Sequence, residues 1–176
     1  MLASPRVQRP AHPKLHLGCG RKILPGFVNV DIVAAPGVDL VCDVSQGIPF
    51  VDDVFDEIRA VDFLEHIPTA RVIFVMNEIH RVLAPGGVLR AHVPCAPGIT
   101  AFQDPTHASF WNEESFTYYL AGHRRREDYG VTYGIRAAFR MQRFKRRRHL
   151  WERFFSTLDL NYLSNYVLDV ELVAVK

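Results

Sequence analysis

The chain has 176 residues, of which 48% are hydrophobic and 23% are charged, an ordinary composition for a globular protein with a sizeable core. No apolar run reaches the roughly 18–20 residues that cross a bilayer, and three cysteines without a disulfide-like pattern favour a cytoplasmic protein. We expect residues 1–13, which carry three prolines and two arginines, to form a flexible tail, and residues 14–176 to form one domain.

The net charge of +2 is unevenly distributed. Residues 121–150 contain ten lysines and arginines against two acidic residues, a charge of +8, which leaves −6 for the rest of the chain (+2 minus +8). A basic block on an otherwise acidic chain favours an anionic partner. Because apolar residues are mixed with Arg140, Arg143 and Arg147, part of this block also has the pattern of an amphipathic strand, whose arginines would simply face water.

A buried strand is predicted over 15–17, where apolar residues run directly into Gly18-Cys19-Gly20. Glycines there let a ligand approach the backbone, and the exposed N–H groups of the turn attract polar ligand atoms. A second strand is predicted over 28–32, and Asp31 near its carboxyl end can accept both hydroxyls of a ribose. A dinucleotide is disfavoured, because position 23 is Ile instead of a third glycine and the first crossover is too short for a three-turn helix.

Apolar periodicity and turn residues predict the later elements: strands over 39–43 and 57–63, a helix over 69–84, a strand over 88–93, a short helix over 112–120, a strand over 139–144, a helix over 152–162 and a strand over 168–175. Thr69 is the expected N-cap of the long helix, Asn112 that of the short one, and Pro85-Gly86-Gly87 the stop signal. Residues 94–112 have no period. A long irregular segment that leaves the ligand end of a strand is expected to lie over the ligand crevice.

Five short motifs follow one another between residues 14 and 93: Leu17-Gly18-Cys19-Gly20, Asp31, Cys42-Asp43-Val44, Asp56-Glu57-Ile58 leading to Leu64-Glu65-His66-Ile67, and Leu83-Ala84-Pro85-Gly86-Gly87-Val88-Leu89. In this order and spacing they resemble the class I S-adenosylmethionine (SAM)-dependent methyltransferases of the type-11 kind. Two departures from the family pattern are the histidine at position 16, where the family usually has an acid, and the short first crossover.

The resemblance implies an α/β fold, a Rossmann-like three-layer sandwich whose seven-stranded, mostly parallel sheet has the order 3-2-1-4-5-7-6. It also implies SAM as the cofactor and S-adenosylhomocysteine as the product. The residues that it places at the cofactor are Leu17, Gly18, Cys19, Gly20, Asp31, Ile32, Asp43, Val44, Asp62 and Phe63. Asp43 has an alternative interpretation as a turn or cap residue.

Asp62, Glu65 and His66 follow the fourth predicted strand, the usual place for catalytic residues in this fold. Their pattern is similar to a metal-associated Glu-x-x-Glu-His of ubiquinone-pathway O-methyltransferases, and carboxylates with an imidazole are able to bind a divalent ion. A Glu-His pair also occurs here in relatives that are not known to need a metal. We therefore expect no metal requirement and a structural or substrate-orienting role for this group, with His66 as a catalytic candidate.

His107 is the main candidate for a general base, because a neutral imidazole takes a hydroxyl proton near pH 7. The alternative is that Asp104 and His107 only hold the loop together. The run Asp104-Pro105-Thr106-His107, followed by aromatic residues, resembles a subgroup of these methyltransferases from glycan or cell-surface biosynthesis. The residues expected to contact the acceptor are Asp104, Phe110, Trp111 and Arg140, with the aromatic ones alternatively belonging to the core.

The expected function is therefore methyl transfer from SAM to a small or glycan- or lipid-linked acceptor, with oxygen as the acceptor atom. One alternative is an RNA methyltransferase that uses the basic residues 121–150, which would bind its substrate with a steep salt dependence. The other is a SAM-fold binding module without catalysis, which would form no product with any acceptor.

Overall fold

The computed structural model describes residues 14–148 and 166–176, so the tail predicted over 1–13 and the helix predicted over 152–162 lie outside the described residues. The elements are β1 Lys14–Leu17, β2 Val28–Asp31, β3 Leu40–Val41, η1 Val44–Gln46, β4 Phe55–Val61, η2 Leu64–His66, α1 Thr69–Val82, β5 Leu83–Pro94, α2 Ile99–Phe102, α3 Glu113–Thr117, α4 Arg124–Tyr133, β6 Phe139–Arg148 and β7 Tyr166–Ala174. Within these ranges no helix has the length and apolar character needed to span a membrane.

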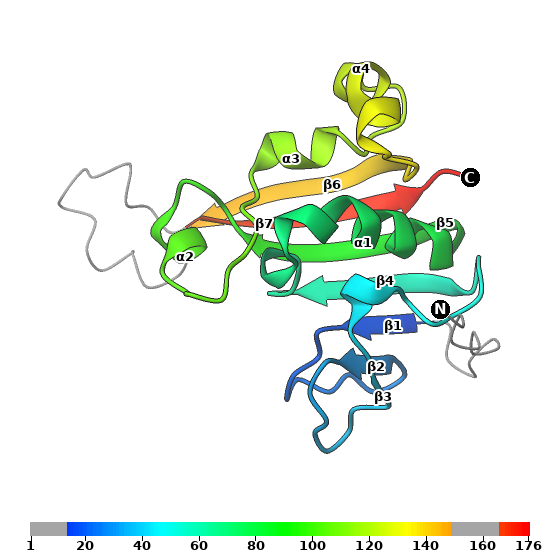
Figure 1. Cartoon of the computed structure of the whole chain (residues 1–176), viewed down its shortest axis with the longest axis vertical. Helices are drawn as coiled ribbons and strands as arrows, with labels where there is room; N and C mark the ends of the chain where they lie inside the picture. Colours follow the sequence, from blue (N-terminus) through cyan, green and yellow to red (C-terminus); the bar gives the residue numbers. More distant parts are fainter. Residues whose placement is uncertain (1–13, 149–165) are drawn as a thin grey trace.

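The seven strands form one sheet in the order β3-β2-β1-β4-β5-β7-β6, which confirms the predicted order (Figure 1). Strands β1 to β5 pair in parallel, whereas β7 is antiparallel to both of its neighbours. The carboxyl ends of the parallel strands therefore meet at one end of the sheet, where ligands bind in open α/β sheets.

One face of the sheet packs against α1, which runs along β5 and in front of it in Figure 1. Val75, Met76 and Ile79 of α1 are fully buried in the same apolar cluster as Ile58 of β4 and Leu89 of β5. The helical spacing of the α1 residues places them on one side of the helix, so their burial positions α1 on this face.

The opposite face carries charged residues. Glu57 of β4 lies 2.9 Å from Nε of Arg59 and 3.3 Å from Nε of Arg90, and Arg90 also binds Glu171 of β7. These residues alternate along their strands with buried apolar ones, so they point away from α1. No described helix covers this charged ladder, so the expected three-layer sandwich has, within the described residues, its helices on one face only.

The shortened first crossover is confirmed, because residues 18–27 form turns and no helix. Asn29 holds this loop: its Nδ2 donates to the carbonyls of Leu24 and Phe27, both at 3.1 Å, and its Oδ1 accepts the Leu24 amide at 2.9 Å. His16 occupies the position where the family usually has an acid, with its Nδ1 3.3 Å from Oδ1 of Asn29. Burial lowers the pKa of His16, which therefore contributes no charge at neutral pH.

The helix boundaries differ from the prediction. Pro68, and not Thr69, is the N-cap of α1, because the Thr69 hydroxyl donates to the carbonyl of Ala108 at 2.6 Å instead of capping the helix. Helix α1 ends at Val82, so Pro85-Gly86-Gly87 lies beyond it in the first residues of β5.

The sequence predicted helix α3 but not helix α4. Asn112 caps α3 as predicted, with its side chain accepting the Ser115 amide at 3.1 Å. Helix α4 was not predicted. Its sequence from Arg124 to Tyr133 has no continuous apolar stripe, and contacts with α1 hold its end: the Asn77 side chain donates to the carbonyl of Gly134 at 2.8 Å.

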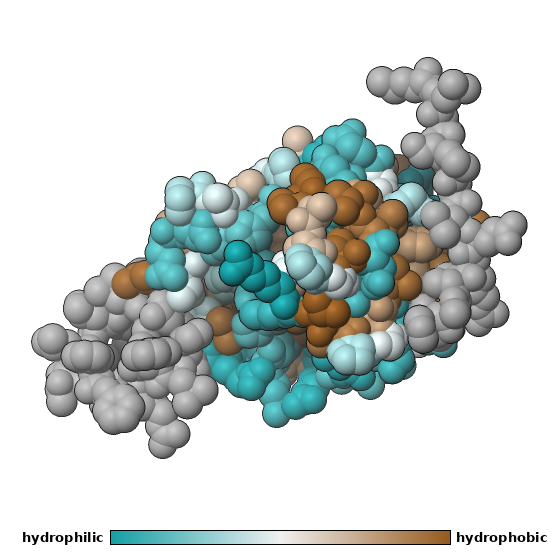
Figure 2. Space-filling model, turned by 90° about the horizontal axis from the view of Figure 1, so that it is seen from below, coloured by the Kyte–Doolittle hydropathy of each residue, from teal (hydrophilic) through white to brown (hydrophobic). Residues whose placement is uncertain are grey.

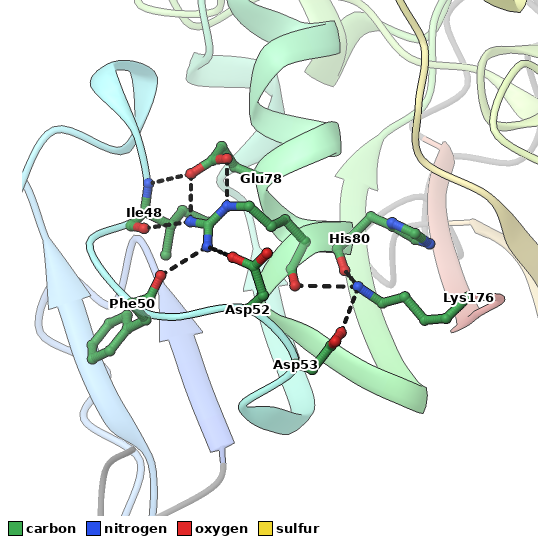
Figure 3. A network of polar contacts seen from close by, with 8 residues as sticks. Ile48, Phe50, Asp52, Asp53, Glu78, His80 and Lys176 are labelled. Atoms are coloured by element: carbon green, nitrogen blue, oxygen red, sulfur yellow. Dashed lines mark hydrogen bonds and ion pairs between the residues drawn. The ribbon is translucent and has the colours of Figure 1, made fainter. Parts of the chain in front are cut away.

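At the amino end of the parallel strands, Arg81 of α1 binds the loop before β4; Figure 3 labels its partners Ile48, Phe50, Asp52 and Glu78. Its guanidinium donates to the carbonyls of Ile48 and Phe50 at 2.7 and 2.8 Å. It also donates to the carboxylates of Glu78 and Asp52, at 2.6 and 2.7 Å. Every donor direction of the guanidinium plane thus meets an oxygen atom, which fixes the loop to the helix.

The β3 edge of the sheet exposes apolar side chains. Viewed from that side, hydrophobic residues gather near the centre of the molecular surface (Figure 2). Ile32, Val33 and Val41 are each more than half exposed, with Ile32 and Val33 at 64% and 65%. The apolar edge continues into the site, because Ile32 also borders the cavity described below.

Candidate functional site

The turn after β1 requires glycine at two positions. Gly18 has φ +63°, and a Cβ there would lie 2.4 Å from Cδ2 of Phe63. Gly20 has φ +50°, and its amide donates to Oδ2 of Asp31 at 2.7 Å. The left-handed backbone and the close approach of the Phe63 ring exclude other residues at position 18. The turn thereby presents bare backbone next to the end of β2.

Strand β2 ends at Asp31, whose carboxylate accepts two backbone hydrogen bonds and is able to accept more. Its Oδ2 accepts the Gly20 amide at 2.7 Å, and its Oδ1 accepts the Val33 amide at 2.9 Å. Each carboxylate oxygen has a second acceptor direction, so the group is preoriented to accept two hydroxyls. This is the geometry that a ribose diol requires.

A cavity of about 470 Å³ lies at the carboxyl ends of β1, β2 and β4. Seven of the ten residues predicted at the cofactor line it: Gly18, Asp31, Ile32, Asp43, Val44, Asp62 and Phe63. The other three, Leu17, Cys19 and Gly20, lie in the strand and turn behind it, with Leu17 and Cys19 in the core. Further lining residues that the motifs did not predict are Val30, Cys42, Ser45, Ile67 and Pro68.

Asp43 has both of the roles considered for it. Its Oδ1 accepts the Ser45 amide at 2.9 Å as the N-cap of η1, and the residue also lines the cavity. The hydrogen bonds from Ser45 lower the pKa of Asp43, so the carboxylate is ionised at neutral pH.

Asp62 follows β4 in a left-handed conformation, with φ 49°. Its amide donates to the carbonyl of His92 at 3.0 Å, and its carboxylate lies 3.5 Å from Nε2 of His92 and 3.7 Å from Nζ of Lys22. A non-glycine residue in this region stores strain, and such residues concentrate at functional sites. Asp62 is thus held at the cavity wall between His92 of β5 and Lys22 of the loop after β1.

The loop after β5 is attached to η2 through the backbone. The amides of Ala108 and Ser109 donate to the carbonyl of Glu65 at 2.8 and 2.9 Å, and the Ser109 hydroxyl donates to the carbonyl of Leu64 at 2.9 Å. The segment expected to be irregular contains the short helix α2. These bonds bring the predicted catalytic residues His66 and His107 together from opposite ends of a long stretch of chain.

The rings of His66 and His107 lie edge to face, with their centroids 4.9 Å apart. His66 also lines the cofactor cavity. Nδ1 of His107 lies 2.9 Å from the carbonyl of Ala101, which only accepts, so this nitrogen carries the proton. Nδ1 of His66 lies 3.1 Å from Oγ1 of Thr106, whose single hydrogen is donated to Asp104 at 2.6 Å. The protons on both Nδ1 atoms leave both Nε2 atoms unprotonated in the neutral rings.

Glu65 lies beside this histidine pair and is 2% exposed. Neither of its carboxylate oxygens has a hydrogen-bond partner among the described residues. Burial raises the pKa of Glu65 to about 7, and the negative charges of Asp62 and Asp104 add to the shift, while the nearby backbone amides of Glu65 and Phe63 partly oppose it without meeting hydrogen-bond geometry. Glu65, His66 and His107 each offer a possible metal ligand atom, and these atoms lie within 4.8 Å of one another.

The residues predicted at the acceptor do not all come together. Asp104 is partly exposed and binds Thr106, while Phe110 is half exposed and stacks on Phe102 at 4.7 Å between ring centroids. Trp111 is buried, and its indole N–H donates to Oγ of Ser109 at 3.0 Å. Phe110 and Trp111 both line a second cavity of about 410 Å³.

Arg140 lies elsewhere. It pairs in register with Val173 of β7, and Val173 pairs with Val88 near the start of β5. The site is at the carboxyl end of β5, so Arg140 is at the opposite end of the sheet and does not join the other predicted acceptor residues. The predicted amphipathic strand is nevertheless present, because Arg140 is exposed next to the fully buried Phe139.

Sequence reasoning missed two residues of the site. Thr106 lies inside the Asp-Pro-Thr-His motif, from which only Asp104 and His107 are assigned roles, and Glu65 belongs to the Asp62-Glu65-His66 pattern, which gives it no role of its own. The signal for Thr106 was its position two residues after an aspartate, a spacing at which the two side chains readily hydrogen-bond. The burial of Glu65 had no sequence signal, because it depends on the loop that covers η2.

Comparisons with known proteins agree with the fold. A family model described as a methyltransferase domain matches residues 22–91. A search of curated proteins gives no match. Among solved structures, a SAM-dependent methyltransferase from Methanosarcina mazei is 14% identical, with a TM-score of 0.60, covering 98% of this chain and 94% of its own.

Two further structures are similar. A SAM-dependent methyltransferase from Archaeoglobus fulgidus is 12% identical, with a TM-score of 0.57, covering 96% of this chain and 86% of its own. The 1,6-didemethyltoxoflavin-N1-methyltransferase of Burkholderia thailandensis, solved with S-adenosylhomocysteine, is 13% identical, with a TM-score of 0.56, covering 98% of this chain and 72% of its own. At these identities the likeness establishes the fold. The match to a methyltransferase domain over residues 22–91, the sheet order and the glycine–aspartate cavity make this chain similar to SAM-dependent methyltransferases of class I.

Proposed function

We propose that the protein transfers the methyl group of SAM to an oxygen atom of a small or glycan- or lipid-linked acceptor. The observation that supports this best is the pair of imidazoles at the cofactor cavity. His66 lines the cavity and His107 packs against it, each with an Nε2 atom free to accept a proton. A neutral imidazole removes the proton of an acceptor hydroxyl as the methyl group arrives, and the loop holds that hydroxyl in line with the sulfonium.

We propose the second cavity as the place of the acceptor's apolar part. Its wall includes Phe110, Tyr118 and Tyr133, and aromatic faces of this kind bind sugar rings and acyl chains by dispersion. The two cavities are neighbours along the chain: Pro68 lines the cofactor cavity, and the next residue, Thr69, lines the aromatic one. An acceptor bound along this boundary would reach from the aromatic wall toward the methyl group.

The test is methyl transfer from labelled SAM to a panel of sugars, lipid-linked glycans and RNA. With an accepted substrate, His107→Gln is expected to lower kcat by about 10²–10⁴-fold while SAM affinity stays unchanged, because a general base acts in the transition state. His123→Asn is the control, since His123 caps α4 away from the cavities and asparagine also caps helices.

Melting temperature is measured on the same samples. Normal turnover with a lowered melting temperature would assign His107 only to holding the loop, through its bond to Ala101. Intact SAM binding without any methylated product would favour a binding module.

An RNA acceptor is the second candidate, favoured by one observation on β6. Arg143 and Arg147 are paired with Glu171 and Asp169, but Arg140 and Lys145 make no ion pair with described residues. Unpaired cations on an exposed strand are available to phosphates. RNA methylation with a steep salt dependence of binding would make RNA the acceptor, and sugar methylation without it would remove this candidate.

A further inference from the structure

The cluster formed by Glu65, His66 and His107 has the composition of a metal site. Two ligands come from η2 and the third from the loop after β5, and their possible ligand atoms all lie within 4.8 Å of one another. Ligand atoms around a tetrahedral zinc ion are about 3.3 Å apart, given bonds of about 2.0–2.1 Å. Side-chain adjustments of about 1.5 Å are therefore enough to close the cluster around an ion.

The carboxylate of Glu65 needs a partner that the described residues do not supply. The residue is 2% exposed, and both carboxylate oxygens are buried without a hydrogen-bond partner among those residues. A buried carboxylate without compensation is costly, so such groups are normally paired with a donor or a cation. The position of Glu65 next to two imidazoles points to a cation bound by all three side chains.

The histidines are held as metal-binding histidines usually are. A metal-ligating histidine donates its other ring N–H to a carbonyl, carboxylate or hydroxyl, which fixes the tautomer and the ring orientation. Nδ1 of His107 donates to the carbonyl of Ala101 at 2.9 Å. Nδ1 of His66 donates to Thr106, which in turn donates to Asp104. Both Nε2 atoms are thereby left with a free lone pair.

We propose that Glu65, His66 and His107 bind one divalent transition-metal ion of the Zn²⁺ class. Two nitrogen donors and one carboxylate suit zinc and its first-row neighbours, whereas Mg²⁺ prefers oxygen ligands and keeps several waters. Asp62 is not one of the ligands, because its carboxylate is placed between Lys22 and His92. The ligand set thus includes His107, a histidine of the loop after β5 that lies outside the sequence pattern around Glu65 and His66.

Three protein ligands leave coordination positions open, as in catalytic zinc sites. Because His66 lines the cavity, a bound ion would lie at its wall. A hydroxyl bound to such an ion would have a lowered pKa, and because Nε2 of His66 and Nε2 of His107 would then be occupied by the ion, its proton would pass to solvent instead of to an imidazole. This role rests on the proposed methyl transfer to oxygen, whereas the binding of the ion itself does not.

The test is a calorimetric titration of the metal-free full-length protein with ZnCl₂, with MgCl₂ as the comparison. We expect one Zn²⁺ per chain with a Kd below about 1 μM, and no Mg²⁺ binding in the same range. His107→Gln is expected to weaken Zn²⁺ binding at least about 100-fold, and the control His123→Asn to leave it unchanged. Co²⁺ in place of Zn²⁺ should give a visible absorption band that His107→Gln abolishes.

A milder variant keeps the test informative where a ligand substitution prevents folding. Thr106→Val keeps all three ligands but removes the acceptor of the His66 N–H, together with the hydroxyl bond to Asp104, and should weaken Zn²⁺ binding about 10–100-fold. Zinc binding that is absent, or unchanged in His107→Gln and Thr106→Val, overturns the proposal. SAM affinity is measured in the same samples. If SAM binds but zinc does not, the metal proposal fails and the proposed function stands. If zinc binds but SAM does not, the metal site stands and the proposed function fails.

Discussion

Two buried glutamates, Glu65 at the carboxyl end of the sheet and Glu78 on α1 near its amino end, have opposite surroundings. They are 2% and 9% exposed. Glu78 accepts two hydrogen bonds from Arg81 and one from the Ile48 amide, at 2.7, 2.6 and 3.1 Å (Figure 3). Glu65 accepts none from the described residues. The same residue type at similar burial is compensated where it holds the fold and uncompensated where a ligand is expected.

Backbone strain is present at both ends of the sheet, so it does not distinguish the candidate site from the other end. Asp53 near the amino end and Asp62 at the carboxyl end both have positive φ, 60° and 49°. Their partners do separate them, because Lys176 lies 2.8 Å from Asp53, whereas Lys22 lies 3.7 Å from Asp62. Charge compensation is therefore the better indicator of function in this molecule.

The largest effect is expected from Glu78→Met, which leaves the Arg81 guanidinium half buried without its main partner. Breaking a buried pair on one side costs about 3–5 kcal/mol, so the free energy of unfolding should fall by that amount, measured by urea denaturation. The double variant Glu78→Met with Arg81→Met is the control and should lose less than the sum of the two single changes. A loss below 1 kcal/mol for Glu78→Met would contradict the comparison.

At the ligand end, Asp31→Ala should act on SAM binding more than on stability. The change removes charge-assisted contacts to the ribose worth about 1.5–3 kcal/mol, roughly 10–100-fold in SAM affinity by calorimetry. Asp52→Asn, at the Arg81 network, is the matched control and should leave SAM affinity unchanged. Equal SAM affinity of folded Asp31→Ala protein would remove Asp31 from the site.

Glu65→Met should change stability in the direction opposite to Glu78→Met. Methionine has a similar shape and removes two buried acceptors that have no partner, so the metal-free protein should gain about 1–3 kcal/mol in the free energy of unfolding. A gain in stability from Glu65→Met, together with a loss from Glu78→Met, would show that Glu65 is retained for a ligand although it makes the fold less stable. Destabilisation by Glu65→Met would instead show that Glu65 has a structural role.

The parts of this molecule that were predictable are those set by local sequence. The turn at Gly18 and the acid at Asp31 follow from strand patterns and from the backbone freedom of glycine, and the strand order came with the motif resemblance. Helix α4 was missed because tertiary contacts, including that of Asn77 with Gly134, stabilise a segment without an apolar stripe.

The rest required three-dimensional contacts between distant segments. The meeting of His66 and His107, and the burial of Glu65 beneath the loop, depend on hydrogen bonds from the amides of Ala108 and Ser109 to η2. The separation of Arg140 from the other predicted acceptor residues has a related reason, because composition does not tell at which end of an antiparallel strand a residue lies.

The smallest effect is expected on the charged ladder, where Glu57 is compensated but close to solvent. Burial by itself raises the pKa of Glu57, but the hydrogen bond and charge of Arg59, with the charges of Arg90 and Lys14, outweigh it and lower the pKa below the ordinary 4.5. A carboxylate with a lowered folded-state pKa stabilises the fold fully above its unfolded-state value, and this contribution is lost as the pH falls through the folded-state pKa.

Glu57→Gln should therefore cost under about 1 kcal/mol at pH 7 and flatten the loss of stability below pH 4.5. Urea denaturation across that pH range measures both effects, and 0.5 M salt should shrink them by about half or more because exposed pairs are screened. A cost at pH 7 as large as that of Glu78→Met would show that this ladder, and not burial behind Arg81, dominates the electrostatic stability of the sheet.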